Sequence, residues 1–435
     1  MGDSCISIIG AGLAGCEVAL QLAKRGYQID LYEMRPHTKT PAHQTDLCAE
    51  LVCSNSMKSG LITTSSGLLK AEMELLDCEL LKIARQCAVP AGNALAVDRG
   101  LFAETTTNII QNNKNINFIN QEVTKFDERE TIIACGPLAS DKLVESIVDI
   151  IGEEYLYFFD AIAPVVSADS LNYDKVFFKT RYDKGEADYL NCPFDKDEYY
   201  HFVESLADGV KHEAKEFENK YFKDINFSFY ENCIPIEELA RRGKDTLRFG
   251  VMRPVGLDNP HTNKRPFAII QLRLENKEKT AYNLVGCQTM LKYGEQKRVF
   301  SLVPGLENAD FLRFGSIHRN TYLNTPSICN GDFSLKKAPN IRLAGQIAGV
   351  EGYTESIFSG LLTALILCGQ IESLPAETIS GQLWKYLITP NDDFKPMNAN
   401  FGLLPDICMD RKNKSLKKEL LSKRSLNALR DFCKN

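Results

Sequence analysis

The chain has 435 residues, of which 44% are hydrophobic and 25% are charged, with a formal net charge of −6. This length exceeds what a single hydrophobic core usually serves and predicts two domains. The acidic balance excludes a protein that coats nucleic acid by bulk charge, although it leaves room for local basic patches. The longest strongly apolar run, residues 361–368, is too short to cross a bilayer.

Cysteine and histidine usage indicates the compartment and argues against a metal site. The fourteen cysteines are dispersed without a CxxC pair, which favours buried thiols in a reducing cytoplasm over a disulfide framework. An apolar run begins at residue 5, so no signal peptide is expected. The six histidines lack the spacing of zinc ligands. We therefore expect a cytoplasmic protein with no membrane segment and no metal.

The first segment has the pattern of a dinucleotide-binding βαβ unit. Residues 5–9 predict a buried strand, and residues 13–25 show the apolar spacing of an amphipathic helix. The turn between them reads Gly10-Ala11-Gly12-Leu13-Ala14-Gly15. In this motif the first glycine permits the tight turn, the second lets a pyrophosphate approach the backbone, and the third lets helix and strand pack closely. The helix start would offer its N–H groups to the phosphates.

An acidic residue after the next strand completes the motif. Residues 28–32 predict that strand, and Glu33 follows 23 positions after Gly10. This offset is typical of the acid that binds a ribose 2′-hydroxyl, which favours FAD or NAD over NADP.

A long loop and further α/β elements follow. Residues 34–69 hold Glu50-Leu51-Val52-Cys53-Ser54-Asn55-Ser56, and loops of this length in compact domains are usually functional. Helices and strands are then expected at 68–84, after Asp98-Arg99, at 116–119 and at 122–126. A buried strand over 131–137 contains Gly136 near its end. Such a strand lies near the cofactor in flavoproteins with this order of elements, which favours FAD as the resident cofactor.

Rossmann character returns late in the chain. A strand over 340–344 is followed by a glycine-rich loop and a helix over 356–368. We expect this loop to form a second wall for the flavin, with contacts from Gly345, Gln346, Gly349, Glu351 and Gly352. Between the two parts, aromatic-rich short strands surround a charged helix over 198–221. The predicted fold is α/β: a Rossmann-type FAD-binding domain, residues 1–157 and 331–435, with an inserted α+β domain, residues 158–330.

Two cysteines lie in settings that suit a reactive thiol. Cys53 lies in a polar loop behind the dinucleotide motif, and Cys233 shortly precedes a basic run. Nearby cations favour a thiolate, although a cysteine is by default a buried small hydrophobe. Both descriptions fit these residues on the sequence alone.

Basic residues gather in two stretches of this acidic chain. Residues 241–273 hold eight Lys or Arg against two acids, and residues 410–435 hold nine against three. Charge runs are usually solvated surface, but RNA would explain both stretches. The candidate RNA contacts are Arg241, Arg242, Lys244, Lys264 and Arg265.

Taken together, these motifs resemble the bacterial folate- and FAD-dependent tRNA (uracil-5-)-methyltransferase family, TrmFO, whose flavin domain is GidA-like. The agreement runs from residue 6 to about residue 405. Matching stretches are IIGAGLAGCEVA, ELVCSNSMKS, VPAGNALAVDR, HRNTYLN, LAGQIAGVEGYTESIFSG and PMNANFGLLP. Cys135 departs from the family pattern, which more often has a smaller hydroxyl residue there.

The resemblance implies methylation of uracil C5, with 5,10-methylenetetrahydrofolate as carbon donor, reduced FAD as reductant and NAD(P)H as co-substrate. A thiolate that adds at C6 makes C5 nucleophilic. A hydride then completes the methyl group, because the methylene unit arrives at the formaldehyde oxidation level. By the family pattern, Cys233 is the nucleophile and Cys53 a second cysteine near the flavin, while His318 and Tyr353 lie by the flavin and folate. The T-loop uridine of tRNA is the expected target.

Three alternatives stay open. The same chemistry fits a uridine of ribosomal RNA, because the choice of RNA depends on surface shape and phosphate contacts. A plain FAD-dependent NAD(P)H oxidoreductase of the redox-disulfide kind would need a close cysteine pair, which the sequence lacks. A non-catalytic flavin-stabilised RNA-binding protein is disfavoured by the presence of both Cys53 and Cys233.

Overall fold

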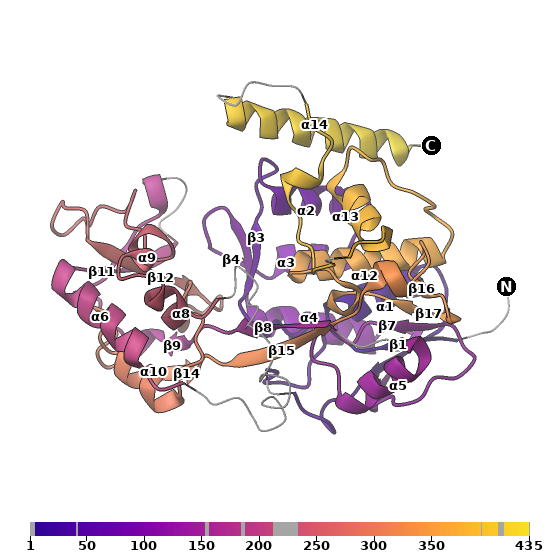
Figure 1. Ribbon diagram of the computed structural model, residues 1–435, viewed down its shortest axis with the longest axis horizontal. Helices are drawn as coiled ribbons and strands as arrows, with labels where there is room; N and C mark the ends of the chain where they lie inside the picture. The colour runs from indigo at the N-terminus through magenta and orange to yellow at the C-terminus, as the bar shows by residue number, and fades with distance from the viewer. Residues whose placement is uncertain are drawn as a thin grey trace.

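The computed structural model describes residues 5–40, 42–152, 156–183, 188–211, 234–392, 394–407 and 413–434. A larger and a smaller lobe are joined by a pair of connecting strands (Figure 1). Each lobe is built on its own six-stranded sheet. No helix in this described part of the chain is long and apolar enough to span a membrane.

The sheet of the larger lobe has the order β16-β17-β7-β1-β2-β6, and every neighbouring pair except β16 and β17 is parallel. Its strands are β1 (Ile6–Ile9), β2 (Ile29–Glu33), β6 (Ile116–Asn120), β7 (Thr131–Ile133), β16 (Ser334–Leu335) and β17 (Ala338–Leu343). The chain runs from β1 through α1 (Leu13–Lys24) to β2, whereas β7 lies on the other side of β1. This change of direction opens a crevice at the carboxyl ends of the strands, where doubly wound proteins bind their ligands.

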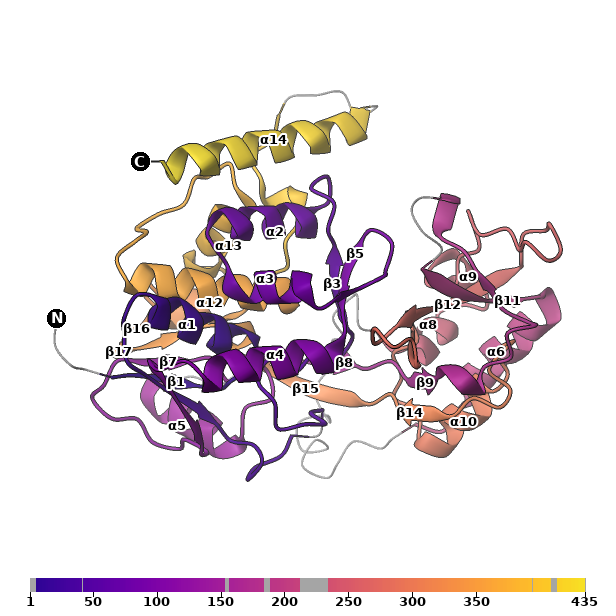
Figure 2. The same cartoon turned by 180° about the vertical axis from the view of Figure 1, so that it is seen from behind.

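Helices cover both faces of this sheet (Figure 2). On one face α1 lies against α12 (Tyr353–Leu367), and a Cβ at Gly360 would lie 2.4 Å from the carbonyl oxygen of Ala14. Ile8 is fully buried on this side, whereas Ile9 packs with Ile147 of α5 (Asp141–Ile151) on the other. The remaining α-helices described in this lobe are α2 (Ser65–Leu75), α3 (Glu79–Gln86), α4 (Arg99–Gln111), α11 (Thr325–Ile328), α13 (Ile379–Ile388) and α14 (Lys414–Phe432).

The smaller lobe is an antiparallel sheet with the order β10-β11-β12-β13-β9-β14. Its strands are β9 (Val165–Ser167), β10 (Phe177–Phe178), β11 (Tyr189–Phe194), β12 (Ala268–Leu274), β13 (Ala281–Leu284) and β14 (Phe311–Arg313). Its described α-helices are α6 (Lys196–Asp208), α8 (Ile236–Arg241), α9 (Thr246–Phe249) and α10 (Tyr293–Phe300). A separate core, which includes Phe194, Phe202 and Phe300, fills this lobe.

The lobes are connected in two ways. Strands β8 (Leu156–Ala161) and β15 (Ile317–Tyr322) pair in antiparallel fashion and carry the chain out to the smaller lobe and back (Figure 1). A small sheet of β3 (Ser56–Ser59), β5 (Ala94–Val97) and β4 (Ala88–Val89) also lies in the larger lobe beside the end of β12. There the side chain of Asn55 donates to the carbonyl oxygen of Leu274 at 2.7 Å. The predicted α/β class and the Rossmann arrangement are confirmed.

Three elements differ from the sequence prediction. The helix expected over 68–84 is two helices, because the chain turns at Asp77 (φ +63°) and Glu17 of α1 accepts the first N–H groups of α3. Residues 122–126 form a loop across the sheet and not a strand. Helix α6 ends at Asp208, well before residue 221, and residues 212–233 lie outside the described part.

The buried carboxylate of Glu72 connects three helices of the larger lobe, α2, α13 and α14. Glu72 of α2 accepts the N–H groups of Ile379 and Ser380 at the start of α13, at 3.0 and 2.7 Å, and the hydroxyl of Ser425 on α14. Each helix start leaves its first N–H groups without a partner inside the helix. Glu72 therefore completes α13 and fixes α14 with one side chain.

We expect Glu72→Ala to lower the free energy of unfolding by about 3 kcal/mol, because it leaves buried donors unpaired. Urea denaturation of the purified protein measures this change. Glu74→Ala is the control on the same helix. The Glu74 carboxylate is about half exposed in its pair with Arg85, so its loss should cost less than about 1 kcal/mol. Equal losses in both variants would contradict the prediction.

Candidate functional site

The glycine-rich turn after β1 forms an open cradle at the start of α1. Gly10 has φ +102°, and a Cβ there would lie 2.6 Å from the Cα of Cys135 beyond β7. A Cβ at Gly15 would lie 1.9 Å from the carbonyl oxygen of Gly10. Gly12 is different: it is the N-cap of α1, and nothing lies within 4 Å of the position of its Cβ. No side chain of the described residues caps this helix, so its first N–H groups, beginning at Leu13 and Ala14, suit an anion.

Glu33 lies at the end of β2, where the ribose-binding acid is expected. Its Oε2 accepts the N–H of Ala11 at 3.1 Å, and its Oε1 accepts Nε of Arg35 at 2.9 Å. Burial opposes the charge on Glu33, but the hydrogen bonds and charge of Arg35 outweigh it and lower the pKa of Glu33. The carboxylate therefore stays ionised in the cavity that Gly10 and Gly12 also line.

The second glycine-rich loop lies against the start of α1. Gly345 has φ +82°, and a Cβ there would lie 2.7 Å from Cβ of Ala14. Within the loop, Nε2 of Gln346 donates to Oε2 of Glu351 at 2.7 Å. The predicted residues of the first and second loops are thus brought together at the crevice of the sheet. Gly136 follows β7 on the same side with φ +67° and open space at its Cβ position.

A carboxylate oxygen beside the second loop accepts no hydrogen bond from the described residues. It is the buried Oε2 of Glu355, whereas Oε1 accepts the N–H of Ala399 at 3.0 Å and pairs with Nζ of Lys58 at 3.4 Å. A Cβ at Gly352 would lie 2.4 Å from that unpaired oxygen. A buried acceptor left open at a glycine loop suits a ligand that brings a donor. The two loops, Glu33 and the open start of α1 together fit a dinucleotide such as FAD.

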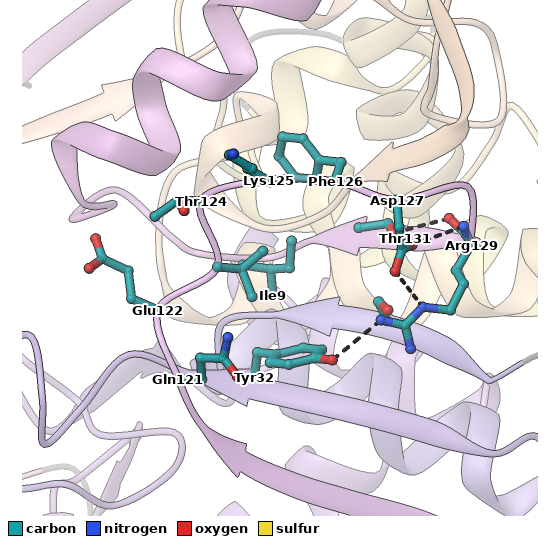
Figure 3. Close-up of a pocket in the computed structure, with 12 residues that line it drawn as sticks. Ile9, Tyr32, Gln121, Glu122, Thr124, Lys125, Phe126, Asp127, Arg129 and Thr131 are labelled. Atoms are coloured by element: carbon teal, nitrogen blue, oxygen red, sulfur yellow. Dashed lines mark hydrogen bonds and ion pairs between the residues drawn. The ribbon is translucent and has the colours of Figure 1, made fainter.

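A second cavity of about 270 Å³ adjoins this crevice on the α5 face of the sheet (Figure 3). The segment from Gln121 to Arg129 arches over Ile9 and Tyr32 there. Arg129 donates to the hydroxyl of Tyr32 at 3.3 Å and pairs with Asp127 at 2.7 Å. Tyr32 and Ile9 line both cavities, so the second extends the first away from the glycine cradle.

The Cys53 loop is tied to the second glycine-rich loop by one side chain. The hydroxyl oxygen of Tyr353, the first residue of α12, accepts the N–H groups of Cys53 at 2.7 Å and Ser54 at 3.2 Å. Burial, followed by negative charge on Cys53, raises the pKa of Tyr353 well above its usual range. The phenol therefore stays protonated and holds Cys53 next to Gly352.

Arginines that the sequence analysis did not select surround the same loop. Arg99 donates to the carbonyl oxygen of Leu51, and Arg313 donates to that of Val52. Asn55, which is fully buried, donates to Val97 at 3.0 Å. The position of Arg99 at the first turn of a helix after the Asp98 cap was the available signal. Nothing local to Arg313 distinguishes it from other surface arginines.

The geometry tests neither the predicted nucleophile Cys233 nor the predicted folate-site residue His318. Cys233 lies outside the described residues, so its closeness to Cys53 stays a prediction. His318 is described only as part of strand β15, where it pairs with Asp160 of β8. The described residues contain no group of three or more His, Cys, Asp or Glu that could hold a metal ion.

The basic run over 241–273 is only partly a surface patch. Arg242, Lys244, Lys264 and Arg265 are exposed on the smaller lobe. The guanidinium of Arg241 donates two hydrogen bonds to the carbonyl oxygen of Ala207, at 2.7 and 3.0 Å. Arg273, at the end of this run, lies outside the patch. Its side chain is buried, and its Nε donates to Oδ1 of Asn55 in the larger lobe at 2.9 Å.

Comparison with known proteins places this architecture in a family. A family model described as "Glucose inhibited division protein A" matches residues 5–375. Proteins named "Methylenetetrahydrofolate--tRNA-(uracil-5-)-methyltransferase TrmFO" from Bacillus velezensis and Bacillus subtilis are each 48% identical over 440 aligned residues, with 100% of both chains covered. The chain belongs to the TrmFO family. The relative from Oleidesulfovibrio alaskensis carries the same name and is 47% identical, with 96% of this chain and 95% of its own length covered.

The solved structure of GidA from Aquifex aeolicus has the same fold. It superimposes with a TM-score of 0.66, with 97% of this chain and 74% of that chain covered. The sequence identity is 14%, so this likeness concerns the fold alone. It supports a GidA-like flavoprotein architecture for the larger lobe of this TrmFO family member.

We expect Gly12→Ala to reduce flavin content without unfolding the protein. The new methyl group meets nothing in the fold, but it occupies the open space in front of α1 where a pyrophosphate would approach. The ratio of visible flavin absorbance to protein in the purified variant measures occupancy, and urea denaturation measures stability. Gly294→Ala, which also meets nothing within 4 Å, is the matched control. Wild-type flavin content in Gly12→Ala would refute the cradle assignment.

Proposed function

We propose that this protein methylates C5 of a uracil in tRNA, with 5,10-methylenetetrahydrofolate as carbon donor and FAD as resident cofactor. One geometric observation carries the proposal: Tyr353 joins the second glycine-rich loop to the backbone of Cys53. A thiol is thereby fixed beside the crevice that fits a flavin. The TrmFO relatives bear a name that states the same donor, RNA and reaction.

The residues of both glycine-rich loops would hold the cofactor. The start of α1 and Gly12 would hold the pyrophosphate, Glu33 would hold the ribose, and Gly345 to Gly352 would line the opposite side of the site. When bound and reduced, the flavin supplies the hydride that turns a methylene unit into a methyl group. NADH or NADPH is the proposed source of its electrons. The aromatic ring of Tyr353 at the start of α12 is a proposed cover for the pterin.

We assign the two cysteines different roles in the reaction at the uracil base. Addition of a thiolate at C6 makes C5 nucleophilic, and we assign this addition to Cys233. Cys53 serves as the second thiol, which exchanges the proton at C5. The target base must leave its stack to reach both groups. His318 is assigned to the folate side of the site.

RNA would approach over exposed cations. On the smaller lobe these are Arg242, Lys244, Lys264 and Arg265. Helix α14 adds further lysines and arginines over the larger lobe (Figure 1). Neutralised phosphates release counterions, which makes such binding salt-dependent. Ribosomal RNA stays the alternative substrate, because these contacts to phosphate do not distinguish one folded RNA from another.

Methylation itself tests the function. Incubation of the protein with methylenetetrahydrofolate, NAD(P)H and total RNA from cells lacking the activity should produce 5-methyluridine in the T loop of tRNA. Cys233→Ala should retain flavin and lose methylation, because the base is no longer activated at C6. The position of the new 5-methyluridine, mapped by mass spectrometry, separates tRNA from ribosomal RNA. Oxidation of NAD(P)H without any methylated RNA would instead favour a plain oxidoreductase.

The exposed cations give a second prediction. Replacing Arg242 and Lys244 by alanine together should weaken tRNA binding and reduce the slope of log affinity against log salt concentration by up to about 2. Filter binding over a range of salt concentrations measures both quantities. Lys175→Ala removes an exposed charge that Glu307 already neutralises on the same lobe, and it should leave the slope unchanged. A salt slope that does not move in the double variant would remove this surface from the RNA interface.

A further inference from the structure

The two carbonyl groups directly before Cys53 are each held by a guanidinium. Arg99, the first residue of α4, donates to the oxygen of Leu51. Arg313, the last residue of β14 in the smaller lobe, donates to the oxygen of Val52. Tyr353 accepts the next two N–H groups. The backbone that carries Cys53 is therefore clamped from three distant segments, and two of the clamps are cations.

The two cations differ in how far they are neutralised. Arg99 forms a two-pronged ion pair with Glu275, with N–O distances of 2.9 and 3.1 Å. Arg313 has no carboxylate within ion-pair distance among the described residues; its second contact is the carbonyl oxygen of Ala42, at 3.5 Å. Burial, then the charge of Arg99, lowers the pKa of Arg313, while negative charge on Tyr353 or Cys53 opposes that effect. The guanidinium nonetheless stays protonated at neutral pH.

The other carboxylates described around this loop form no ion pair with Arg313. Glu50 pairs with Arg35, and Glu104 and Glu278 line the cavity that Arg313 also lines. Tyr353 is neutral, because burial raises its pKa. The pKa of His43 is lowered to about 4, by burial and then by Arg35, so its ring is neutral as well. The carboxylate of Glu275 is matched by Arg99. Arg313 therefore carries a positive charge next to Cys53 with no ion-pair partner among the described residues, and buried Arg273, which donates to Asn55, is a further cation close by.

We propose that Arg313, together with Arg99, is a positioning residue that fixes the Cys53 loop and holds its thiol as the thiolate. This inference rests on the proposed function in one respect: the proposed function assigns the Cys53 thiol its role in the reaction. Cations close to a cysteine favour the anionic form, which is the form that takes up a proton or attacks carbon. A cavity of about 480 Å³ between the lobes is lined by both arginines. The thiolate thus depends on a residue of the smaller lobe.

The pH dependence of thiol alkylation tests this inference without RNA or folate. Wild-type protein and variants are treated with iodoacetamide at a series of pH values, and the peptide that carries Cys53 is quantified by mass spectrometry. Arg313→Gln should raise the midpoint for Cys53 by about one pH unit and slow its alkylation at neutral pH by about tenfold. Arg313→Lys keeps the charge and should recover much of the wild-type rate. Arg298→Gln, which removes a half-exposed arginine paired with Glu295 on the smaller lobe, should change nothing.

A variant with the opposite sign separates electrostatics from mere loss of structure. Glu275→Gln releases the charge of Arg99 from its ion pair, and it should move the Cys53 midpoint to lower pH. If the substitutions only loosened the Cys53 loop, Glu275→Gln would not move the alkylation midpoint of Cys53 to lower pH. An unchanged profile in both Arg313→Gln and Glu275→Gln, in protein with wild-type circular dichroism, overturns the inference. If Arg313→Gln does not fold, Glu275→Gln and Arg313→Lys decide the outcome.

The same variants distinguish this inference from the proposed function. If the alkylation midpoints shift as stated and wild-type protein methylates no RNA, the thiolate assignment stands and the methyltransferase assignment falls. If wild-type protein methylates tRNA and the midpoints do not move, the methyltransferase assignment stands and the role of the arginines falls. A Cys53→Ala sample, in which the alkylated peptide must disappear, verifies that the correct thiol is measured.

Discussion

The close approach of α1 to its neighbours is the constraint on which the site depends. The first turn of this helix is squeezed between β1, β7 and α12, and glycines make that possible. A Cβ at Gly15 would lie 1.9 Å from the carbonyl oxygen of Gly10, and one at Gly360 would lie 2.4 Å from that of Ala14. At Gly12, by contrast, a Cβ would meet nothing within 4 Å, and this residue lines the crevice. The packing thus presents the unpaired N–H groups of α1 to a ligand and closes every other side.

That packing also determines where the reactive thiol lies. Helix α12 follows the second glycine-rich loop, and its contact with α1 fixes Tyr353 at its first position. The phenol oxygen then accepts the N–H groups of Cys53 and Ser54. The distance from dinucleotide cradle to thiol is therefore set by a helix–helix contact and not by the loop itself. This explains how a loop with little regular structure can hold a side chain steadily.

Much of the larger lobe could be predicted because its signals are local. Strand β1, the glycine turn, α1 and Glu33 follow one another within a short stretch, and each obeys a spacing rule. The break between α2 and α3 escaped prediction because Glu17, on another helix, supplies the acceptor that starts α3. The burial of Arg273 could not be predicted for a related reason. A count of charges along the chain does not show which face of β12 a residue occupies.

The arginines around Cys53 could not be predicted from the sequence for the same reason, and they lie beside a candidate catalytic residue. Arg99 and Arg313 are far apart in the chain, and each looks like an ordinary surface cation in its own segment. They become a pair only because β14 lies at the edge of the smaller sheet, next to β9 and facing the larger lobe. Their effect then follows from charge balance, since Glu275 pairs with Arg99 and no carboxylate in the described part of the chain pairs with Arg313. A thiolate stabilised in this way requires both lobes to contact the Cys53 loop. The protonation state of the Cys53 thiol therefore depends on how the two lobes are arranged.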